Sequence, residues 1–140
     1  MEIIGRNEFV DLPELGLFGL KAKIDTGAYR SAIHYHDLRI ETINNVKTLI
    51  ITLDLIGDQP VEKKFTDFKI TKVKSSFGDK SKRYFIRTKM RIGDIEKMVD
   101  LSFSDRSDMR YPLLIGRKVL AKTFLVDVSA KYLHSQNSSD

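Results

Sequence analysis

Asp25 has both the side chain and the setting needed for acid–base chemistry. It follows residues 20–24, whose alternating apolar and charged side chains are typical of a half-buried β-strand. Gly27 permits a tight bend after it, and the Thr26 hydroxyl can hydrogen-bond the main chain or a neighbouring chain. A carboxylate held in such a loop can act as a general acid or base toward water. Because Asp-Thr-Gly is also a common structural turn, the tripeptide alone leaves that second interpretation open.

A second segment, residues 111–117, favours the catalytic interpretation. It contains three apolar residues ending at Ile115, followed by Gly116 and Arg117, and residues 117–122 have a short helical pattern. This order predicts a buried strand that ends where the backbone of another segment approaches closely.

Together, the two segments resemble the retropepsin-like aspartic peptidases. In that family an apolar-Asp-Thr-Gly-Ala turn, here residues 24–28, is followed downstream by an apolar-apolar-Gly-Arg segment. The match is closer to a bacterial and archaeal branch labelled ATP-dependent zinc proteases, whose members are often encoded beside ATP-grasp glutamate ligases. It extends from Ile4 to Val128 and rests on these segments in order: residues 4–6, 21–28, 31–34, Arg83, Arg87 and residues 105–117.

The resemblance also implies roles for individual residues. The implied catalytic residues are Asp25, Thr26 and Gly27, with structural support from Ile115, Gly116 and Arg117. The implied candidates for substrate binding are Ala28, Arg83, Arg87, Arg106 and Arg110, and Arg30 is a further candidate because it lies beside the Asp-Thr-Gly turn. This chain has Tyr29-Arg30 where the family usually has Arg-Thr, so we expect Arg30 to affect substrate specificity.

Aspartic peptidase chemistry needs two carboxylates that share one proton, because two adjacent carboxylates cannot both ionise. This chain has a single Asp-Thr-Gly, since Asp127-Val128-Ser129 lacks the glycine. The resemblance therefore implies a symmetric homodimer in which each chain supplies one Asp25. The association with glutamate ligases suggests an acidic peptide or protein-tail substrate such as oligoglutamate, which arginine side chains bind through paired hydrogen bonds. We expect no cofactor.

The zinc-protease label raises a metal-dependent alternative. His34 and His36 are two residues apart on an extended segment, so they share one face and could chelate a metal together with Asp25 or Asp37. No His-Glu-x-x-His motif and no cysteine accompanies them, so we expect no metal site. ATP dependence is unsupported as well, because the chain has no Gly-x-x-x-x-Gly-Lys-Ser/Thr loop.

The other alternative is a non-catalytic basic β-barrel that binds acidic peptide or nucleic acid. The chain has 24 Lys and Arg against 19 Asp and Glu, a net charge of +5, and aromatic residues occur among lysines over residues 63–85. Such aromatics more often belong to a core, and no RNA-binding signature is present. A phosphate-binding face has no use for Asp25 in a rigid turn, so nucleic acid is the less favoured partner.

These motifs must be positioned by β-strands. Short apolar segments punctuated by glycine and proline predict an all-β fold, a small closed retropepsin-like barrel with one short C-terminal helix. The predicted strands are residues 20–24, 49–56, 65–73, 84–92, 95–103 and 124–128, with a hairpin at Gly93-Asp94. Residues 72–82 are a candidate flap over the substrate, or else an ordinary surface loop.

Length and composition set the remaining expectations. The 140 residues suit one domain over residues 1–134, followed by a polar tail over residues 135–140. No apolar run reaches the ~20 residues that span a bilayer, and the N-terminus lacks the pattern of a secretory signal. Together with the absence of cysteine, these features predict a cytoplasmic protein that does not associate with membranes.

Overall fold

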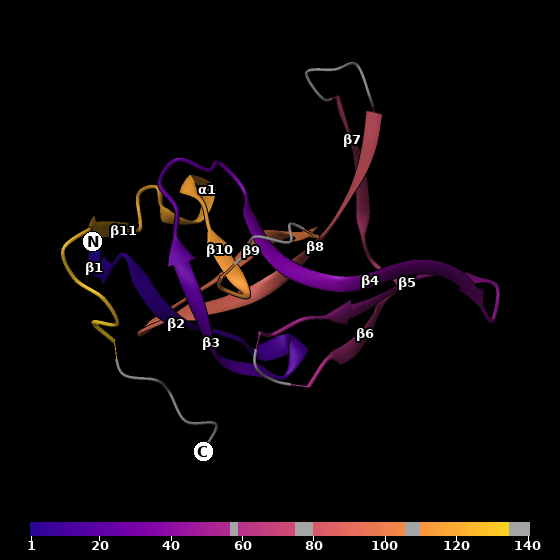
Figure 1. Ribbon diagram of the computed structural model, residues 1–140, viewed down its shortest axis with the longest axis horizontal. Helices are drawn as coiled ribbons and strands as arrows, with labels where there is room; N and C mark the ends of the chain where they lie inside the picture. Colours follow the sequence, from indigo (N-terminus) through magenta and orange to yellow (C-terminus); the bar gives the residue numbers. More distant parts are fainter. Residues whose placement is uncertain (57–58, 75–79, 106–109, 135–140) are drawn as a thin grey trace.

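The computed structural model describes residues 1–56, 59–74, 80–105 and 110–134, and β-strands make up most of these residues (Figure 1). The elements in chain order are β1 (Glu2–Gly5), β2 (Asn7–Leu12), η1 (Pro13–Leu15), β3 (Leu17–Ile24), β4 (Ser31–Ile43), β5 (Val46–Leu53), β6 (Val61–Phe65), β7 (Lys69–Lys74), β8 (Lys80–Ile92), β9 (Ile95–Ser104), β10 (Leu113–Ile115), α1 (Arg117–Leu120) and β11 (Phe124–Asp127). Within these ranges no helix has the length and apolar character needed to span a bilayer.

Six strands close into a barrel, which confirms the predicted fold class. The ring runs β10-β3-β2-β8-β9-β4 and returns to β10, because β4 pairs with both β9 and β10. The inward-facing positions alternate with outward-facing ones along each strand. Ala22, Ile33, Leu101, Leu113 and Ile115 are fully buried inside, and they form part of one apolar core.

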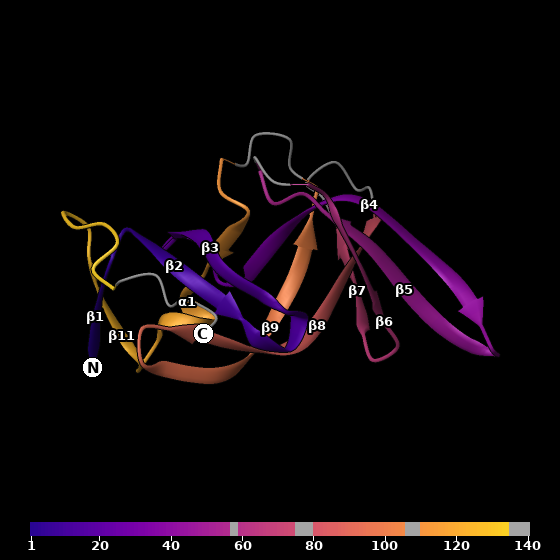
Figure 2. The same ribbon diagram turned by 90° about the horizontal axis from the view of Figure 1, so that it is seen from below.

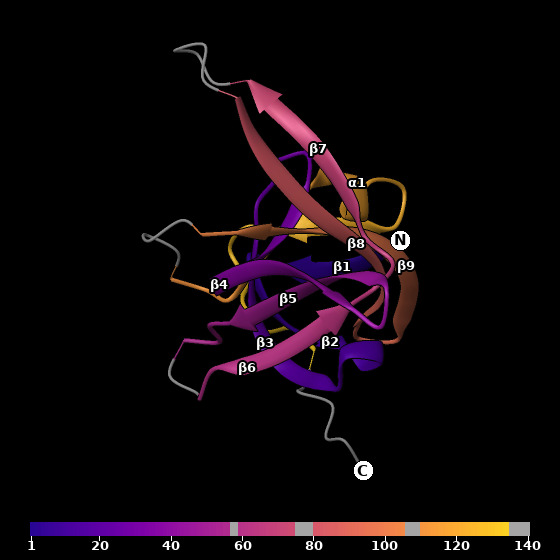
Figure 3. The same ribbon diagram turned by 90° about the vertical axis from the view of Figure 1, so that its right-hand side faces the viewer.

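Strands β4 and β8 are longer than the barrel and extend beyond it. The outer part of β4 pairs with β5, and β5 pairs with β6. The outer part of β8 pairs with β7 from Lys69↔Phe85 to Lys74↔Lys80. Figure 1 shows both pairs extending from the barrel in different directions, and Figure 3 shows the β7–β8 arm from another side.

The structure divides the strand predicted over residues 65–73. β6 ends at Phe65, β7 begins at Lys69, and the two strands pair with different neighbours. Thr66 and Asp67, residue types that favour turns, are exposed between them. The other predicted strands are present with shifted ends, and the hairpin at Gly93 is confirmed by the Ile92↔Ile95 pair.

The predicted helix is shorter in the structure, and the candidate flap is described only in part. The predicted helix over residues 117–122 stops at Leu120, and Lys122 adopts a positive φ of 63° that is incompatible with continuing the helix. The candidate flap over residues 72–82 includes the paired ends of β7 and β8, but residues 75–79 lie outside the described residues.

The two ends of the chain meet in a separate sheet. β1 and β11 pair in parallel, with Ile3 opposite Leu125, and both side chains are 54% exposed. The buried Glu8 carboxylate accepts hydrogen bonds from the amides of Gly5, Leu133 and His134, which joins the C-terminal segment to the barrel. Figures 1 and 2 show the β1–β11 pair at the opposite end of the molecule from the β4–β5 hairpin turn.

Asp11 is a second buried acidic residue, and it also has a structural role. It lies opposite Arg91 where β2 meets β8, and the guanidinium donates to its Oδ2 at 2.8 and 3.1 Å. Its Oδ1 accepts from the Gly19 amide at 2.8 Å. Because the hydrogen bonds to Glu8 and Asp11 come from the fold itself, neither carboxylate is available for chemistry on a ligand.

Candidate active site

Asp25 lies in a turn that closes on itself directly after β3. The Asp25 amide donates to the Ile115 carbonyl at 2.8 Å, and the Ala28 amide donates to the Asp25 carbonyl at 3.2 Å. The Asp25 Oδ1 accepts from the Gly27 amide at 3.0 Å. A Cβ on Gly27 would lie 3.3 Å from that same oxygen, so the glycine permits this close approach. The carboxylate is half-buried and is oriented by the Gly27 amide.

The start of α1 holds the turn from the other side. The Arg117 and Lys118 amides donate to the carbonyls of Ala28 and Tyr29, at 2.8 and 3.0 Å. The Gly116 amide donates to the buried Ser31 hydroxyl at 3.0 Å. A Cβ on Gly116 would lie 2.6 Å from the Arg30 carbonyl oxygen, so only glycine fits. The two segments that the sequence paired are therefore in direct contact.

The Arg117 side chain completes this support. Its Nη1 donates to the Thr26 carbonyl at 3.1 Å, and its guanidinium lies 5.9 Å from the centre of the Tyr29 ring. The structure thus places Arg117 against the turn rather than in the cleft beside it.

A cleft of about 310 Å³ opens next to Asp25. The residues that line it are Asp25, Ala28, Tyr29, Arg30, Ala32, Arg83, Ser102, Ser104 and Leu114. Strand pairing explains its floor, because paired residues of neighbouring strands point to the same face of the sheet. Five such neighbours cross the outer face of the barrel in the order Lys23, Leu114, Ala32, Ser102 and Phe85. The small side chains in the middle of this row leave room for a ligand.

Two basic residues lie on the edge of this cleft. Arg30 and Arg83 both line it, and the Arg30 guanidinium lies 5.9 Å from the centre of the Phe85 ring. Of the described residues that line the cleft, only Asp25 carries a carboxylate. The cleft therefore combines one fixed carboxylate with two guanidinium groups that suit an anionic ligand.

Other predicted substrate-binding residues lie elsewhere. Arg87 pairs with Asp100 at 3.1 Å and does not line the cleft. Hydrogen bonds from Lys118 and then from Arg87 hold the pKa of Asp100 below its usual range. Arg110 lines a different and larger pocket. Arg106 lies outside the described residues.

The two histidines considered as metal ligands lie in different surroundings in the structure. His34 is mostly buried and lies 3.7 Å from Asp54, whereas His36 is exposed after a bulge in β4 between Tyr35 and Asp37. In the part of the chain that the structure describes, no three His, Cys, Asp or Glu side chains come together as a metal site.

Sequence reasoning missed several residues that line the cleft. Ala32, Ser102, Ser104 and Leu114 were not among the predicted site residues, although all four line the cleft with Asp25. The alternation of Ser102 and Ser104 with the buried Phe103 is a visible signal for an outward polar face. That signal does not reveal which strand lies next to β9, so it could not assign these serines to the site.

Comparison with known proteins identifies the family. A model for RimB-like proteins, described as "Retropepsin-like aspartic endopeptidase RimB", matches residues 3–137. The chain belongs to the RimB-like family. Two curated relatives of this RimB-like chain are each named "Probable alpha-L-glutamate ligase". One, from Shewanella pealeana, is 30% identical over 93% of this chain, and the other, from Desulfotalea psychrophila, is 27% identical over 90%. The chain spans only 29% and 28% of their respective lengths.

A solved structure has the same fold. The Legionella pneumophila protein Lpg0085, described as having unknown function, superposes with a TM-score of 0.74 over 94% of this chain and 97% of its own. The two sequences are 23% identical, so this likeness concerns the architecture of the RimB-like domain and not its activity.

Proposed function

We propose that this protein is an aspartic peptidase that hydrolyses peptide bonds in acidic, oligoglutamate-like tails, with a dyad of Asp25 carboxylates formed across a homodimer. The observation that carries the proposal is the fixed carboxylate of Asp25, whose turn is held by Gly27 and by the amides that follow Gly116. One carboxylate of the dyad accepts a proton from the attacking water, and the other donates a proton to the carbonyl oxygen. The departing amine is then protonated by the dyad.

The need for a second carboxylate supports the dimer. Among the described residues lining the cleft, Asp25 has no acidic neighbour that could complete a dyad. A two-fold axis near the turn would bring in Asp25 of a second copy. Symmetry also accounts for a mechanism in which the two carboxylates exchange the roles of acid and base.

An apolar surface next to the turn suits such an axis. A shallow hollow of about 310 Å³ is lined by Thr26 and Arg117 and by apolar residues of α1 and β11, namely Leu120, Ala121, Phe124, Leu125 and Val126. Ile3 of β1 and Leu125 of β11 are paired neighbours and are each 54% exposed, so they extend this apolar surface. Burial of this surface against a second copy would also bring the two Asp25 turns together.

The charge of the cleft supports an acidic substrate. Arg30 and Arg83 lie beside Asp25, and their guanidinium groups can bind glutamate carboxylates on either side of the bond to be cleaved. The names of the ligase relatives agree with a substrate that contains glutamate.

The test is mass spectrometry of a peptide with an oligoglutamate tail, incubated with the wild-type protein or with Asp25→Asn in the presence of a chelator. We expect the wild-type protein to shorten the tail and the variant to be slower by about a thousandfold, because the variant lacks the acid–base group. Equal cleavage by both proteins would remove Asp25 from its role. An intact tail in both samples, over several pH values, would count against the peptidase.

The second candidate function is a binding module for nucleic acid, and the β7–β8 arm favours it. Lys69, Lys72 and Lys82 are exposed on this arm, on strands that project from the barrel. Tight binding of single-stranded RNA that weakens steeply with added salt, together with no cleavage of any acidic peptide, would support this function instead.

A further inference from the structure

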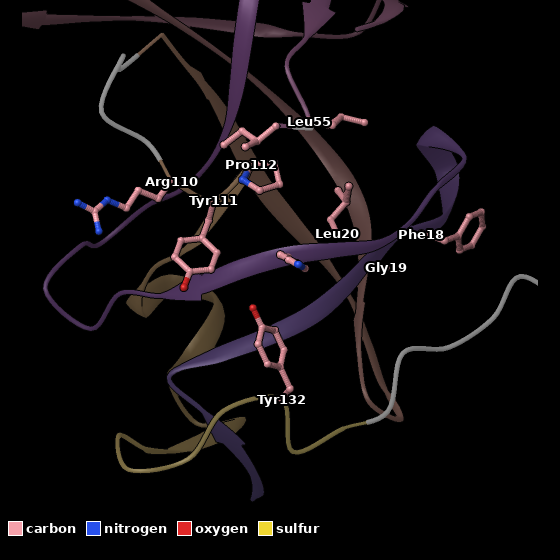
Figure 4. A pocket seen from close by; sticks show the side chains of 10 residues that line it. Phe18, Gly19, Leu20, Leu55, Arg110, Tyr111, Pro112 and Tyr132 are labelled. Atoms are coloured by element: carbon pink, nitrogen blue, oxygen red, sulfur yellow. The ribbon is translucent and has the colours of Figure 1, made fainter. Parts of the chain in front are cut away.

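The described residues form a second pocket that is larger than the cleft beside Asp25. It has a volume of about 550 Å³ and lies over the first half of β3. Phe18, Gly19, Leu20 and Lys21 of β3 line it, together with Leu55, Ile56, Arg110, Tyr111, Pro112 and Tyr132 (Figure 4). Its walls are part apolar and part polar, and the polar part includes two cations and two phenol groups.

The pocket and the catalytic cleft lie on the same face of the barrel. Lys21 and Lys23 are both exposed on the outer face of β3, and Lys23 is paired with Leu114, which lines the cleft. Lys21 precedes Asp25 by four residues, which corresponds to roughly 13 Å along an extended strand. An extended peptide of about four residues therefore covers the distance from Asp25 to the pocket.

Tyr132 of the pocket is held in position by the fold. The Tyr132 ring stacks on Phe9 at 4.6 Å, and its amide donates to the Asn7 carbonyl at 2.7 Å. Phe9 is the strand neighbour of Lys21, so Tyr132 lies beside that lysine. Figure 4 shows the hydroxyls of Tyr111 and Tyr132 directed toward one another across the pocket.

The side chains that line the pocket can donate hydrogen bonds to an anion. Burial, and then the neighbouring Tyr111 and Glu8, raise the pKa of Tyr132, so its hydroxyl remains a hydrogen-bond donor at neutral pH. Lys21 and Arg110 add two positive charges, and no lining residue is acidic. Ammonium, guanidinium and phenol donors around an apolar floor suit a carboxylate on an aliphatic stem, which is the chemistry of a glutamate side chain.

We propose that the pocket formed by Lys21, Arg110, Tyr111 and Tyr132 is an anchor site for the part of an acidic peptide tail that lies about four residues from the scissile bond. This inference rests on the proposed peptidase function for its substrate class. It adds that the protein distinguishes long acidic tails from short ones, because only a long tail reaches both Asp25 and the pocket.

The test uses the Asp25→Asn protein, in which binding is measured without cleavage. Fluorescently labelled oligoglutamate peptides of about eight and about three residues are titrated by anisotropy, the shorter being unable to span the strand distance. We expect Lys21→Gln and Arg110→Gln each to weaken binding of the long peptide about tenfold, because each removes a charge-assisted hydrogen bond. Tyr132→Phe should cause a smaller loss, since it removes one neutral donor.

Lys47→Gln is the matched control, because it removes the same charge from an exposed position near the β4–β5 turn. The anchor is overturned if Lys47→Gln weakens the long peptide as much as Lys21→Gln does, or if the variants affect long and short peptides equally. Cleavage by the wild-type protein is measured separately. If the wild-type protein cleaves long and short tails equally well, the anchor site is overturned and the peptidase function still stands. Length-dependent binding without cleavage supports the anchor and counts against the peptidase.

Discussion

The backbone around Asp25 is held by residues about ninety positions later in the chain. Its amide donates to Ile115, and the amides of Arg117 and Lys118 donate to the carbonyls of Ala28 and Tyr29. The Asp25 carboxylate accepts only the Gly27 amide among the contacts described, so its other oxygen is directed to no fixed donor. A rigid turn with an accessible carboxylate is what general acid–base chemistry requires.

Gly116→Ala tests the packing of this turn. The added Cβ would lie 2.6 Å from the Arg30 carbonyl oxygen and 2.8 Å from the Tyr29 carbonyl carbon, and backbone atoms cannot move aside without shifting the turn. We expect the free energy of unfolding to fall by about 2 kcal/mol, as in overpacked cores, and peptide cleavage to be lost with it. Urea denaturation and peptidase assays measure the two effects.

Gly27→Ala is the matched comparison for that variant. Its Cβ would meet only the Asp25 Oδ1, at 3.3 Å, and a carboxylate can rotate away. We therefore expect Gly27→Ala to cost less stability than Gly116→Ala but still to disturb the catalytic group. Equal losses of stability would mean that the backbone around Gly116 is not packed more tightly than the backbone around Gly27.

At the scale of elements, β9 joins the barrel to the helix that supports the site. Asp100 of β9 accepts hydrogen bonds from Arg87 of β8 and from Lys118 of α1. Because Lys118 also donates its amide to the Tyr29 carbonyl, the Asp100–Lys118 pair connects β9 with the turn that holds Asp25. Asp100 thus links α1 to β9 through its ion pair with Lys118.

Asp100→Asn tests this connection through pH. Lys118 and then Arg87 lower the pKa of Asp100 below its ordinary value of 3.8, so the charged form is favoured in the folded state. The stabilisation is therefore complete above about pH 4 and is lost as the pH falls through the lowered pKa. We expect Asp100→Asn to reduce the free energy of unfolding by about 1 kcal/mol at pH 7, because Arg87 and Lys118 are largely exposed and screened. The difference from wild type should shrink below pH 4 in denaturant titrations.

Asp94→Asn serves as the control, since Asp94 is exposed at the turn between β8 and β9. It should change the free energy of unfolding little at any pH. If Asp100→Asn is equally neutral at pH 7, the ion pair contributes nothing measurable and α1 is held by its backbone contacts alone.

At the scale of the whole molecule, β1 and β11 form one small sheet beside the turn that holds Asp25. In the described residues β1 and β11 pair only with each other, and their exposed side chains include Ile3 and Leu125. The hollow that contains Leu125 also contains Thr26. The proposed dimer uses this surface, so assembly and catalysis should depend on the same residues.

Leu125→Arg tests the dimer. The substitution replaces an exposed apolar side chain with a charge that would face its symmetry mate, so we expect the dimer dissociation constant to rise at least about tenfold. Sedimentation velocity measures the assembly, and cleavage should fall in parallel at low protein concentration. Val46→Arg is the control, because Val46 is 46% exposed at the opposite end of the molecule. A monomeric wild-type protein that cleaves would contradict the dimer and require a second carboxylate from elsewhere.

The local pattern of the sequence determined the elements and the turn that holds Asp25. Period-two alternation in residues 20–24 and 95–103 predicted β3 and β9, and Gly93 predicted the hairpin that joins β8 to β9. These signals can be read from the sequence because they depend only on residues close in the chain. The link between Asp25 and Gly116 was inferred from a family resemblance and not from periodicity.

Only the tertiary structure decided which side chains share the cleft. Arg83 lies in it, Arg87 pairs with Asp100, and Arg110 lies in the larger pocket, although all three are exposed or partly exposed cations with similar surroundings in the sequence. The physical reason is that the barrel closes through β4–β9 and β3–β10, which are parallel pairs between segments far apart in the chain. The register of such pairs assigns each side chain to a neighbour, and no local pattern encodes that register.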